Sequence, residues 1–265
     1  MLLHYVEELL IFLVCSCLVF SLLSLWMPCN RGIKWWKENI WTDFSFIFLM
    51  PLVTRWVYFY MMMGASMVLY GFDLSEDDFF IFYEEGAGGV VSTQPLWLQA
   101  VLYLFLSDLY LYWVHRLFHR GFLWKFHAVH HFPKQLDWIH SFRFHPINFW
   151  LAFTLVDVLC IMIGFSPMVM VELMVLNKFY SLMVHANVNW TFGAFKYILA
   201  SPVFHRWHHT RYDEGGNKNF APTFPILDVI FGTFYMPKGV LPEHYGVDHP
   251  MPADPVGQLF YPFSR

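Results

Sequence analysis

Histidines are concentrated in three short segments of this chain, at spacings that would let their imidazoles act together. Eight of the 14 histidines lie there: His115 and His119; His127, His130 and His131; and His205, His208 and His209. The first segment reads H-x-x-x-H and the other two read H-x-x-H-H. On a helix, residues at i, i+3 and i+4 share one face. The spacing therefore predicts three faces that could bind metal.

The type of ligand narrows the choice of metal. Neutral imidazoles suit iron, zinc, copper or nickel, whereas calcium and magnesium prefer oxygen. A structural zinc needs only about four ligands, so this number of histidines suits two ions. The segment from His115 to His119 contains no glutamate and so lacks the H-E-x-x-H motif of zinc proteases. The four cysteines include no C-x-x-C pair, which argues against a cysteine-bound zinc or a disulfide framework.

The composition is that of a membrane protein. Hydrophobic residues make up 57% of the chain, aromatic residues 21% and charged residues only 14%, against about a quarter charged in soluble domains. The formal net charge of -4 and the dispersed basic residues argue against nucleic-acid binding.

The apolar stretches must position the histidines. They run over residues 9–27, 44–70, 96–114, 147–165 and 167–184, and each is about long enough to cross a bilayer as a helix. The last two are separated by the turn signal Gly164-Phe165-Ser166-Pro167, and that pair could span or re-enter the membrane. We expect an all-α integral membrane protein with four to five membrane-embedded helices and a cytosolic, histidine-rich helical cap. The first stretch follows Glu7 and Glu8 rather than a basic run and is interpreted as a retained helix.

Charge in the loops predicts the orientation. Arg31, Lys34 and Lys37 follow the first stretch, whereas the loop after the second carries only acidic charges, among them Asp73, Glu76, Asp77, Asp78, Glu84 and Glu85. The positive-inside rule places the first loop in the cytoplasm. Counting spans from there brings all three histidine segments to that same side.

The ordered motifs resemble the fatty acid hydroxylase/sterol desaturase superfamily of integral-membrane di-iron oxygenases. The resemblance begins at Ser107-Asp108 and the first histidine segment and continues through the other two. Similar short motifs lie around them: Arg143-Phe144-His145-Pro146, His185-Ala186-Asn187, Asn219-Phe220, and Asp228 with Phe231-Gly232-Thr233. It covers about residues 97–237. The chain is interpreted as one structural domain with N-terminal membrane helices and an acidic loop (1–95), a catalytic region (96–240) and a Pro-rich tail (241–265).

The resemblance assigns roles to individual residues. It implies iron ligation by His115, His119, His127, His130, His131, His185, His205, His208 and His209. His140 and His145 stay open between ligation, indirect support and packing. Asp108 lies two helical turns before His115 and could accept a hydrogen bond from a ligand imidazole. Arg143, Asn187, Asn219 and Asp228 are further candidates for support around the ligands.

The activity that the resemblance implies is O2-dependent hydroxylation or desaturation of an unactivated C–H bond in a lipid such as a sterol, fatty acyl chain or ether lipid. Two iron ions would be the cofactors, with zinc as a possible occupant of purified protein. The sequence has no G-x-G-x-x-G dinucleotide fingerprint and no haem-binding His-Pro-Gly-Gly. A separate reductase, ferredoxin or cytochrome is therefore implied as electron donor. A bacterial inner membrane is favoured over the endoplasmic reticulum, with the active site facing the cytoplasm.

Two other classes of function remain open from the residues. A zinc-dependent membrane hydrolase would act on a lipid ester or amide and would need a general base such as Glu243 or Asp213. A metal transporter or sensor would place its ligands at bilayer depth along a pathway. The choice between hydroxylation and desaturation also stays open, because both can begin with abstraction of the same hydrogen.

Overall fold

The computed structural model describes residues 2–32, 34, 39–70, 81–84 and 90–264. This part of the chain is helical and contains no strand, and its two isolated β-bridges pair Pro28 with Val188 and Thr210 with Tyr245. The predicted all-α class is confirmed. Most of the predicted acidic loop, including Asp73, Glu76, Asp77, Asp78 and Glu85, lies outside the described residues, as does Lys37.

Within the described part of the chain, four helical segments are long and apolar enough to cross a membrane, so the chain is a multi-pass membrane protein. Three are the continuous helices α2 (Ile40–Tyr70), α4 (Leu96–Phe118) and α8 (Pro167–His185). The fourth is built from three pieces in series: α6 (Pro146–Phe149), the π-helical turn η3 (Trp150–Thr154) and α7 (Leu155–Ile163). Pro51 lies inside α2. Membrane-spanning helices tolerate an internal proline because neighbouring groups can satisfy the freed backbone carbonyl.

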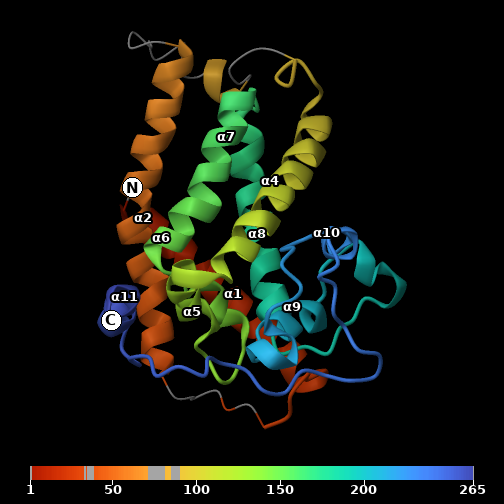
Figure 1. Ribbon diagram of the computed structural model, residues 1–265. Helices are drawn as coiled ribbons and strands as arrows, with labels where there is room; N and C mark the ends of the chain where they lie inside the picture. The colour runs from red at the N-terminus through yellow and green to blue at the C-terminus, as the bar shows by residue number, and fades with distance from the viewer. Residues whose placement is uncertain (1, 33, 35–38, 71–80, 85–89, 265) are drawn as a thin grey trace.

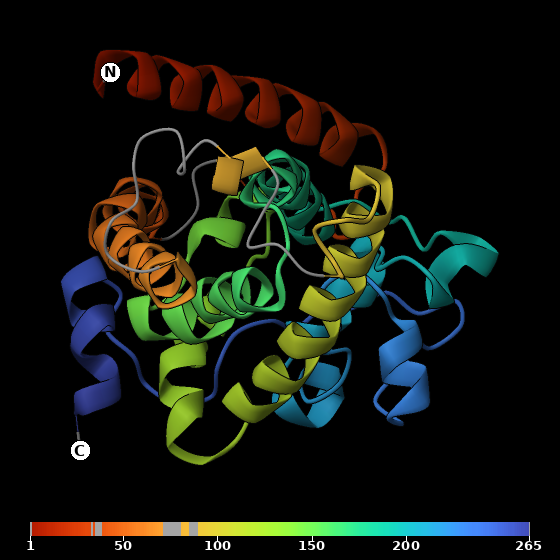
Figure 2. The same ribbon diagram turned by 90° about the horizontal axis from the view of Figure 1, so that it is seen from above.

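The first apolar stretch forms the predicted helix, α1 (Leu2–Trp26), which is 25 residues long. Whether it crosses the membrane stays a prediction. Figures 1 and 2 show α1 running obliquely across one side of the bundle rather than parallel to the other helices. The ring centroid of Phe20 lies 5.4 Å from that of Phe179 on α8, while Leu18, Leu22 and Leu25 are exposed. This helix therefore covers the bundle with one face and presents apolar side chains outward with the other.

The turn between α7 and α8 makes a helical hairpin. Gly164 ends α7 in the left-handed region, with φ +104°, and Pro167 begins α8. Glycine suits the first position because it has no Cβ to clash, and proline suits the first turn of a helix because that turn needs no N–H partner. The hairpin returns His185 to the same end of the bundle as the C-terminal end of α4 (Figure 1).

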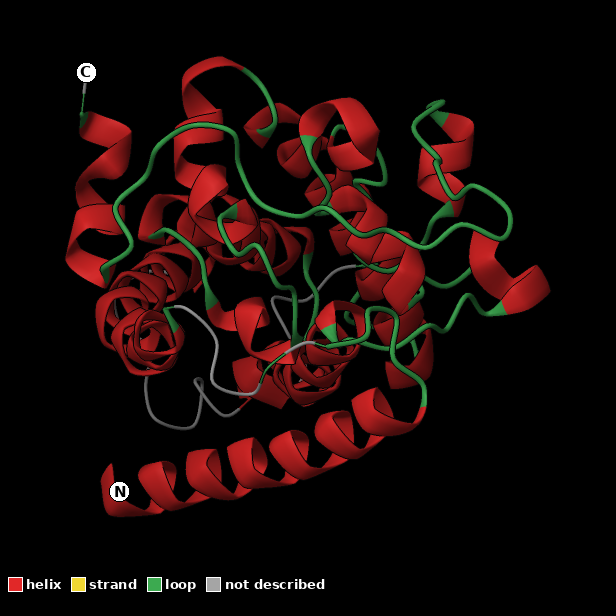
Figure 3. Cartoon of the chain, turned by 90° about the horizontal axis from the view of Figure 1, so that it is seen from below, coloured by secondary structure: helices red, strands yellow, loops and turns green. Residues whose placement is uncertain are grey.

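The polar end of the bundle carries short helices and long loops. The second histidine segment forms α5 (Trp124–His131), reached through η1 (Gly121–Leu123), and η2 (Trp138–Phe142) follows it. Beyond α8 the chain forms η4 (Gly193–Tyr197), α9 (Pro202–His208) with the third segment, η5 (Tyr212–Gly216) and α10 (Ile226–Ile230). Figure 3 shows these elements and their loops from below. All the histidine segments thus gather at one end of the molecule.

The Pro-rich tail is more ordered than its composition indicates. It contains α11 (Pro255–Phe260) and η6 (Tyr261–Phe263). Asp254 caps α11 by accepting a hydrogen bond from the Gly257 backbone N–H at 2.7 Å. Figures 1 and 2 agree that α11 lies beside α2, so the C-terminal end of the chain packs against its first span-length helix.

Candidate metal centre

The structure brings nine histidines together in two groups. The five-histidine group contains His115, His119, His127, His131 and His208, and the four-histidine group contains His130, His185, His205 and His209. Within each group, the nearest ring nitrogens all lie within 4.8 Å of one another. These nine are the residues that the sequence analysis named first as ligands. Every member except His115 is buried.

The two H-x-x-H-H segments are each divided between the groups. On α5, His127 and His131 face the five-histidine group while His130 faces the other. From α9, His208 joins the first group, whereas His205 and His209 join the second. A spacing of four residues keeps His127 with His131 and His205 with His209 on one face. The third histidine of each segment, on a neighbouring face, therefore reaches the other group.

The Nε2 atoms converge at short distances. In the five-histidine group, the Nε2–Nε2 distances are 2.9 Å for His115–His127, 3.1 Å for His127–His131 and 3.0 Å for His131–His208. In the four-histidine group, the corresponding distances are 3.2 Å for His130–His185, 3.0 Å for His185–His205 and 3.1 Å for His205–His209. Each group thus points its Nε2 atoms at a common centre.

The opposite ring nitrogens meet oxygen acceptors. His115 Nδ1 is 2.7 Å from the Phe220 carbonyl oxygen, His127 Nδ1 is 2.8 Å from Asn148 Oδ1, and His208 Nδ1 is 2.8 Å from the Lys218 carbonyl oxygen. In the second group, His130 Nδ1 is 3.0 Å from the Arg143 carbonyl oxygen and His185 Nδ1 is 2.7 Å from that of Ser181. Each of these oxygens can only accept. The proton of a neutral ring must therefore be on Nδ1, and Nε2 carries the lone pair.

This arrangement fits a bound cation in each group. Nε2 lone pairs about 3 Å apart repel each other and cannot form a hydrogen bond. Two nitrogens at about 2.1 Å from one ion would lie about 3.0 Å apart at a right angle and about 3.4 Å apart in a tetrahedron. The Nε2 distances in both groups, 2.9–3.2 Å, are close to these separations, so each group could hold a metal ion.

Burial keeps the imidazoles neutral, as metal ligation requires. The pKa values of His119, His127, His130 and His131 are all well below the usual value, chiefly because burial penalises the charged form and secondly because neighbouring histidines repel it. The same causes lower the pKa values of His205, His208 and His209. Neither nitrogen of His119 has a hydrogen-bond partner among the described residues, so this ring is available as a ligand.

Asp108 and Asp228 support the five-histidine group indirectly. Asp228 accepts hydrogen bonds from the backbone N–H groups of Phe220 and Ala221 at 2.7 and 2.9 Å. Asp108 accepts from Thr223 and Phe224 at 2.8 and 2.9 Å, rather than from the imidazole that the sequence analysis considered. Two buried carboxylates therefore fix the loop whose Phe220 carbonyl orients His115.

The side chains of Asn187 and Asn219 form hydrogen bonds with backbone groups of distant loops. Asn187 exchanges hydrogen bonds of 2.9 Å with the backbone of Asn30 in the loop after α1. Asn219 adopts φ +57°. Its side-chain amide donates to the carbonyl oxygens of Phe204 and Tyr235 and accepts from the Tyr235 backbone N–H. These contacts tie the ends of α8 and α9 to distant loops.

The two histidines left open by the sequence analysis lie outside both groups. His140 pairs with Asp43 at 3.3 Å through Nε2 and contacts the backbone of Asp137 through Nδ1. His145 caps α6 by accepting from the Ile147 backbone N–H, and its Nε2 contacts the Leu259 carbonyl oxygen at 3.0 Å. Both histidines thus contact other parts of the chain and belong to neither histidine group.

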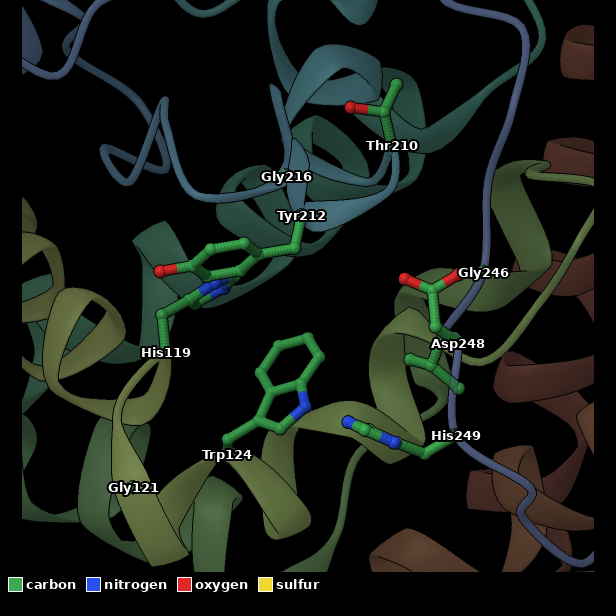
Figure 4. A pocket seen from close by; sticks show the side chains of 10 residues that line it. His119, Gly121, Trp124, Thr210, Tyr212, Gly216, Gly246, Asp248 and His249 are labelled. Atoms are coloured by element: carbon green, nitrogen blue, oxygen red, sulfur yellow. The ribbon is translucent and has the colours of Figure 1, made fainter. Parts of the chain in front are cut away.

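A cavity of about 250 Å³ reaches the five-histidine group at His119. Figure 4 shows His119 beside the ring of Tyr212, with Trp124 next to it and Asp248 and His249 opposite. The Trp124 ring lies 5.0 Å from that of His119 and 5.2 Å from that of His131. This polar and aromatic mouth is an opening to the centre from the loop-rich end of the molecule.

Two supporting residues escaped the sequence analysis. Asn148 orients His127, and its only signal was its place two residues after Pro146. Arg206 is fully buried between the ligands of α9 and donates to the carbonyl oxygens of Leu136 and His185 at 2.9 and 3.2 Å. Its place between two predicted ligands, in His205-Arg206-Trp207-His208, was the available clue.

Comparison with known proteins identifies the family. The family model described as fatty acid hydroxylase matches residues 100–233, about half of the chain, and this range contains all nine clustered histidines. The chain belongs to the fatty acid hydroxylase family. The resemblance stated from the histidine segments is thereby confirmed.

Curated relatives of this fatty acid hydroxylase family member act on several lipids. This chain is 33% identical over 172 residues to the ornithine lipid hydroxylase OlsE of Rhizobium tropici. The aligned residues cover 64% of this chain and 52% of that protein. It is 29% identical over 141 residues to human alkylglycerol monooxygenase, covering 53% and 31%. It is 26% identical over 173 residues to the Delta(7)-sterol 5(6)-desaturase ERG3A of Gibberella zeae, covering 60% and 46%. The chain thus spans about half or less of the length of these relatives. No solved structure matches it.

Proposed function

We propose that this protein is a membrane-bound di-iron oxygenase that hydroxylates or desaturates an unactivated C–H bond of a lipid, using O2 and two external electrons. The observation that carries the proposal is the pair of histidine groups whose Nε2 lone pairs converge at 2.9–3.2 Å. Relatives named as a lipid hydroxylase, an alkylglycerol monooxygenase and a sterol desaturase support the reaction class.

Two irons would be held by the nine histidines, one ion in each group. Bound iron would supply the activation of O2 that cleavage of a C–H bond needs. The protein's part is to hold the rings neutral, to direct Nε2 inward through acceptors on Nδ1, and to keep bulk water away by burial. The acceptors for His115, His127 and His130 come from three different segments, which fixes the ring directions independently.

The position of the centre suits a substrate that arrives from a bilayer. His115 and His185 lie at the ends of span-length helices, so both groups sit where the apolar bundle meets the polar cap. A lipid can reach this level without leaving the membrane. The cavity at His119 opens on the other side, toward the loops, and offers a route for small polar reactants.

Electrons would come from a separate reductase, ferredoxin or cytochrome, because the sequence has no dinucleotide or haem motif of its own. We further propose that the histidine-bearing end faces the cytoplasm of a bacterial inner membrane. Arg31 and Lys34 lie in the loop before α2 at this end, in agreement with the positive-inside rule.

Metal content and ligand replacement test the proposal together. Protein produced in iron-replete cells and purified in detergent should contain about two irons per chain. His208→Ala should lose metal from the five-histidine group and His130→Ala from the four-histidine group, and both should abolish oxidation of a lipid panel in the presence of O2 and a reductase. His249→Ala, at the rim of the cavity, serves as the control that keeps both metals.

Retention of full activity by either ligand variant would overturn the di-iron assignment. Hydrolysis of lipid esters without O2 or reductant would replace it with the zinc hydrolase. Membrane insertion is checked separately, by recovery of each variant in the detergent-extracted membrane fraction.

A further inference from the structure

A buried polar cluster links α2 and α11 to the four-histidine group. At its centre is Arg143, which is only 1% exposed. Its guanidinium donates to the Asp43 carboxylate on α2 and, through Nε and Nη2, to Gln258 Oε1 on α11 at 3.1 and 3.0 Å. Asp43 and Gln258 are buried as well. Breaking a buried pair of this kind leaves an uncompensated charge, so the cluster holds Arg143 firmly in one position.

Arg143 reaches the metal centre through its main chain. Its carbonyl oxygen accepts the hydrogen bond from His130 Nδ1 at 3.0 Å. The next residue, Phe144, stacks on the His130 ring with a centroid distance of 4.2 Å and an interplanar angle of 15°. The placement of this two-residue segment therefore determines both the tautomer of His130 and the plane of its ring.

The C-terminal helix holds the same segment at a second point. His145 Nδ1 accepts from the Ile147 backbone N–H, so its Nε2 carries the proton and donates to the Leu259 carbonyl oxygen at 3.0 Å. Gln258 is fixed in turn by its Nε2, which donates to the Pro252 carbonyl oxygen at 3.0 Å. The adjacent residues Gln258 and Leu259 of α11 thus hold Arg143 and His145 by hydrogen bonds, on either side of Phe144.

We propose that Gln258 and Asp43 are positioning residues for the four-histidine group, acting through Arg143 to aim His130 Nε2 at its metal. The inference rests on the proposed metal centre. Both residues lie outside the range 100–233 that matches the family. The cluster contains no member of the five-histidine group, so its effect should be selective for one of the two metals.

The test is an anaerobic titration of the metal-free full-length protein in detergent with ferrous iron. Gln258→Met keeps the length of the side chain but removes the acceptor for Arg143. We expect one of the two metals to bind up to about 10-fold more weakly, with the other unchanged. This is the lower end of the usual effect of losing a direct partner of a ligand, because the Arg143 carbonyl itself remains. Gln258→Glu restores the acceptor and should recover tight binding of both metals.

Two further variants sharpen the result. Asp43→Asn should weaken the same metal, and combining it with Gln258→Met should cost less than the sum of the two changes, because both act through Arg143. Gln94→Ala is the matched control: its side chain also bonds to backbone, at 2.9 Å from the Val90 carbonyl oxygen, but it precedes α4 and lies far along the chain from the histidines.

The outcomes separate the two proposals. Fewer than two metals in the unmodified protein would overturn the metal centre itself. Two tightly bound metals in Gln258→Met, or equal weakening of both metals in a variant that keeps the melting temperature of the unmodified protein, would leave the metal centre standing and overturn the selective positioning role. Failure of Gln258→Glu to restore binding would also overturn it.

Discussion

Five of the nine clustered histidines have different surroundings at their two ring nitrogens. Nδ1 of His115, His127, His130, His185 and His208 meets an oxygen acceptor, so Nε2 is left to bind metal. Four of these acceptors are backbone carbonyl groups. The fifth, Asn148, is a side chain and can be changed without disturbing the backbone.

Replacing Asn148 tests this division of roles. Asn148→Leu keeps the approximate volume but removes the acceptor for His127, so the affinity of the five-histidine group for metal should fall about 10–100-fold. Asn148→Asp keeps an acceptor at the same place and should lose far less. The measurement is the dissociation constant for ferrous iron under anaerobic conditions. Equal affinities in the Leu and Asp variants would show that the hydrogen bond does not matter.

The residue scale also shows what sequence could and could not predict. The expectation that all members of an H-x-x-H-H segment share one face holds for the pairs four residues apart and is wrong for the third histidine, which faces the other group. The identity of the nine clustered histidines followed from short spacings and family motifs. Their division into groups of five and four did not, since it depends on how α5 and α9 are rotated against each other. The acceptors at Phe220, Lys218 and Ser181 are backbone groups, which every residue type carries. No pattern of side chains could have marked them.

Among the elements, the hairpin of α7 and α8 depends most clearly on one residue. Gly164 has φ +104°, a region that costs other residues about 1–2 kcal/mol. Gly164→Ala should therefore lower the melting temperature in detergent. Gly64→Ala is the control, because this glycine lies within helix α2 with no heavy atom within 4 Å of an added Cβ. The control should be neutral or stabilising by up to about 1 kcal/mol. A Gly164 variant as stable as its control would contradict this account of the turn.

Elements were predictable where hydropathy alone decides them. The four span-length segments fall within a few residues of the expected stretches, because burial in lipid demands length and apolarity. The first apolar stretch forms a helix as expected, and only the fold shows its oblique course across the bundle. Within the tail, Pro255 takes the first turn of α11, where a proline is favoured.

At the scale of the whole molecule, the buried histidines make stability depend on pH. The pKa values of His127, His130, His131 and His208 lie well below the usual value of about 6.5 because burial disfavours the charged rings. Below that pH the unfolded chain takes up protons that the folded chain does not. The contribution of these histidines to the free energy of unfolding of the metal-free protein should therefore be constant above about pH 7 and fall as the pH decreases.

Thermal unfolding of chelator-treated protein at pH 8, 6 and 5 checks this sign. The slope should approach about 1.4 kcal/mol per pH unit for each histidine that stays neutral. Metal-loaded protein should resist acid better, because bound metal competes with protons for Nε2. Equal stability of metal-free protein at pH 8 and 5 would contradict the burial of neutral rings.

Orientation is a second property of the whole molecule. Fusing a reporter that is active only in the cytoplasm to the C-terminal end should give signal in a bacterial host, because α11 lies at the histidine-bearing end. A reporter active only outside the cytoplasm should stay silent at that position. The reverse result would place the metal centre on the other face of the membrane.

The sharing of each H-x-x-H-H segment between both groups has a consequence for biosynthesis. His131 and His208, whose Nε2 atoms meet at 3.0 Å, are separated by 77 positions, with the whole α7–α8 hairpin between them. Neither group is complete until the hairpin has inserted and α9 has been translated. During that interval the early histidines are partial chelators, open to whichever metal the cell holds in excess, and zinc binds such nitrogen sites more tightly than ferrous iron. If the two groups bind metal as proposed, their metallation would depend on timing during membrane insertion as well as on affinity.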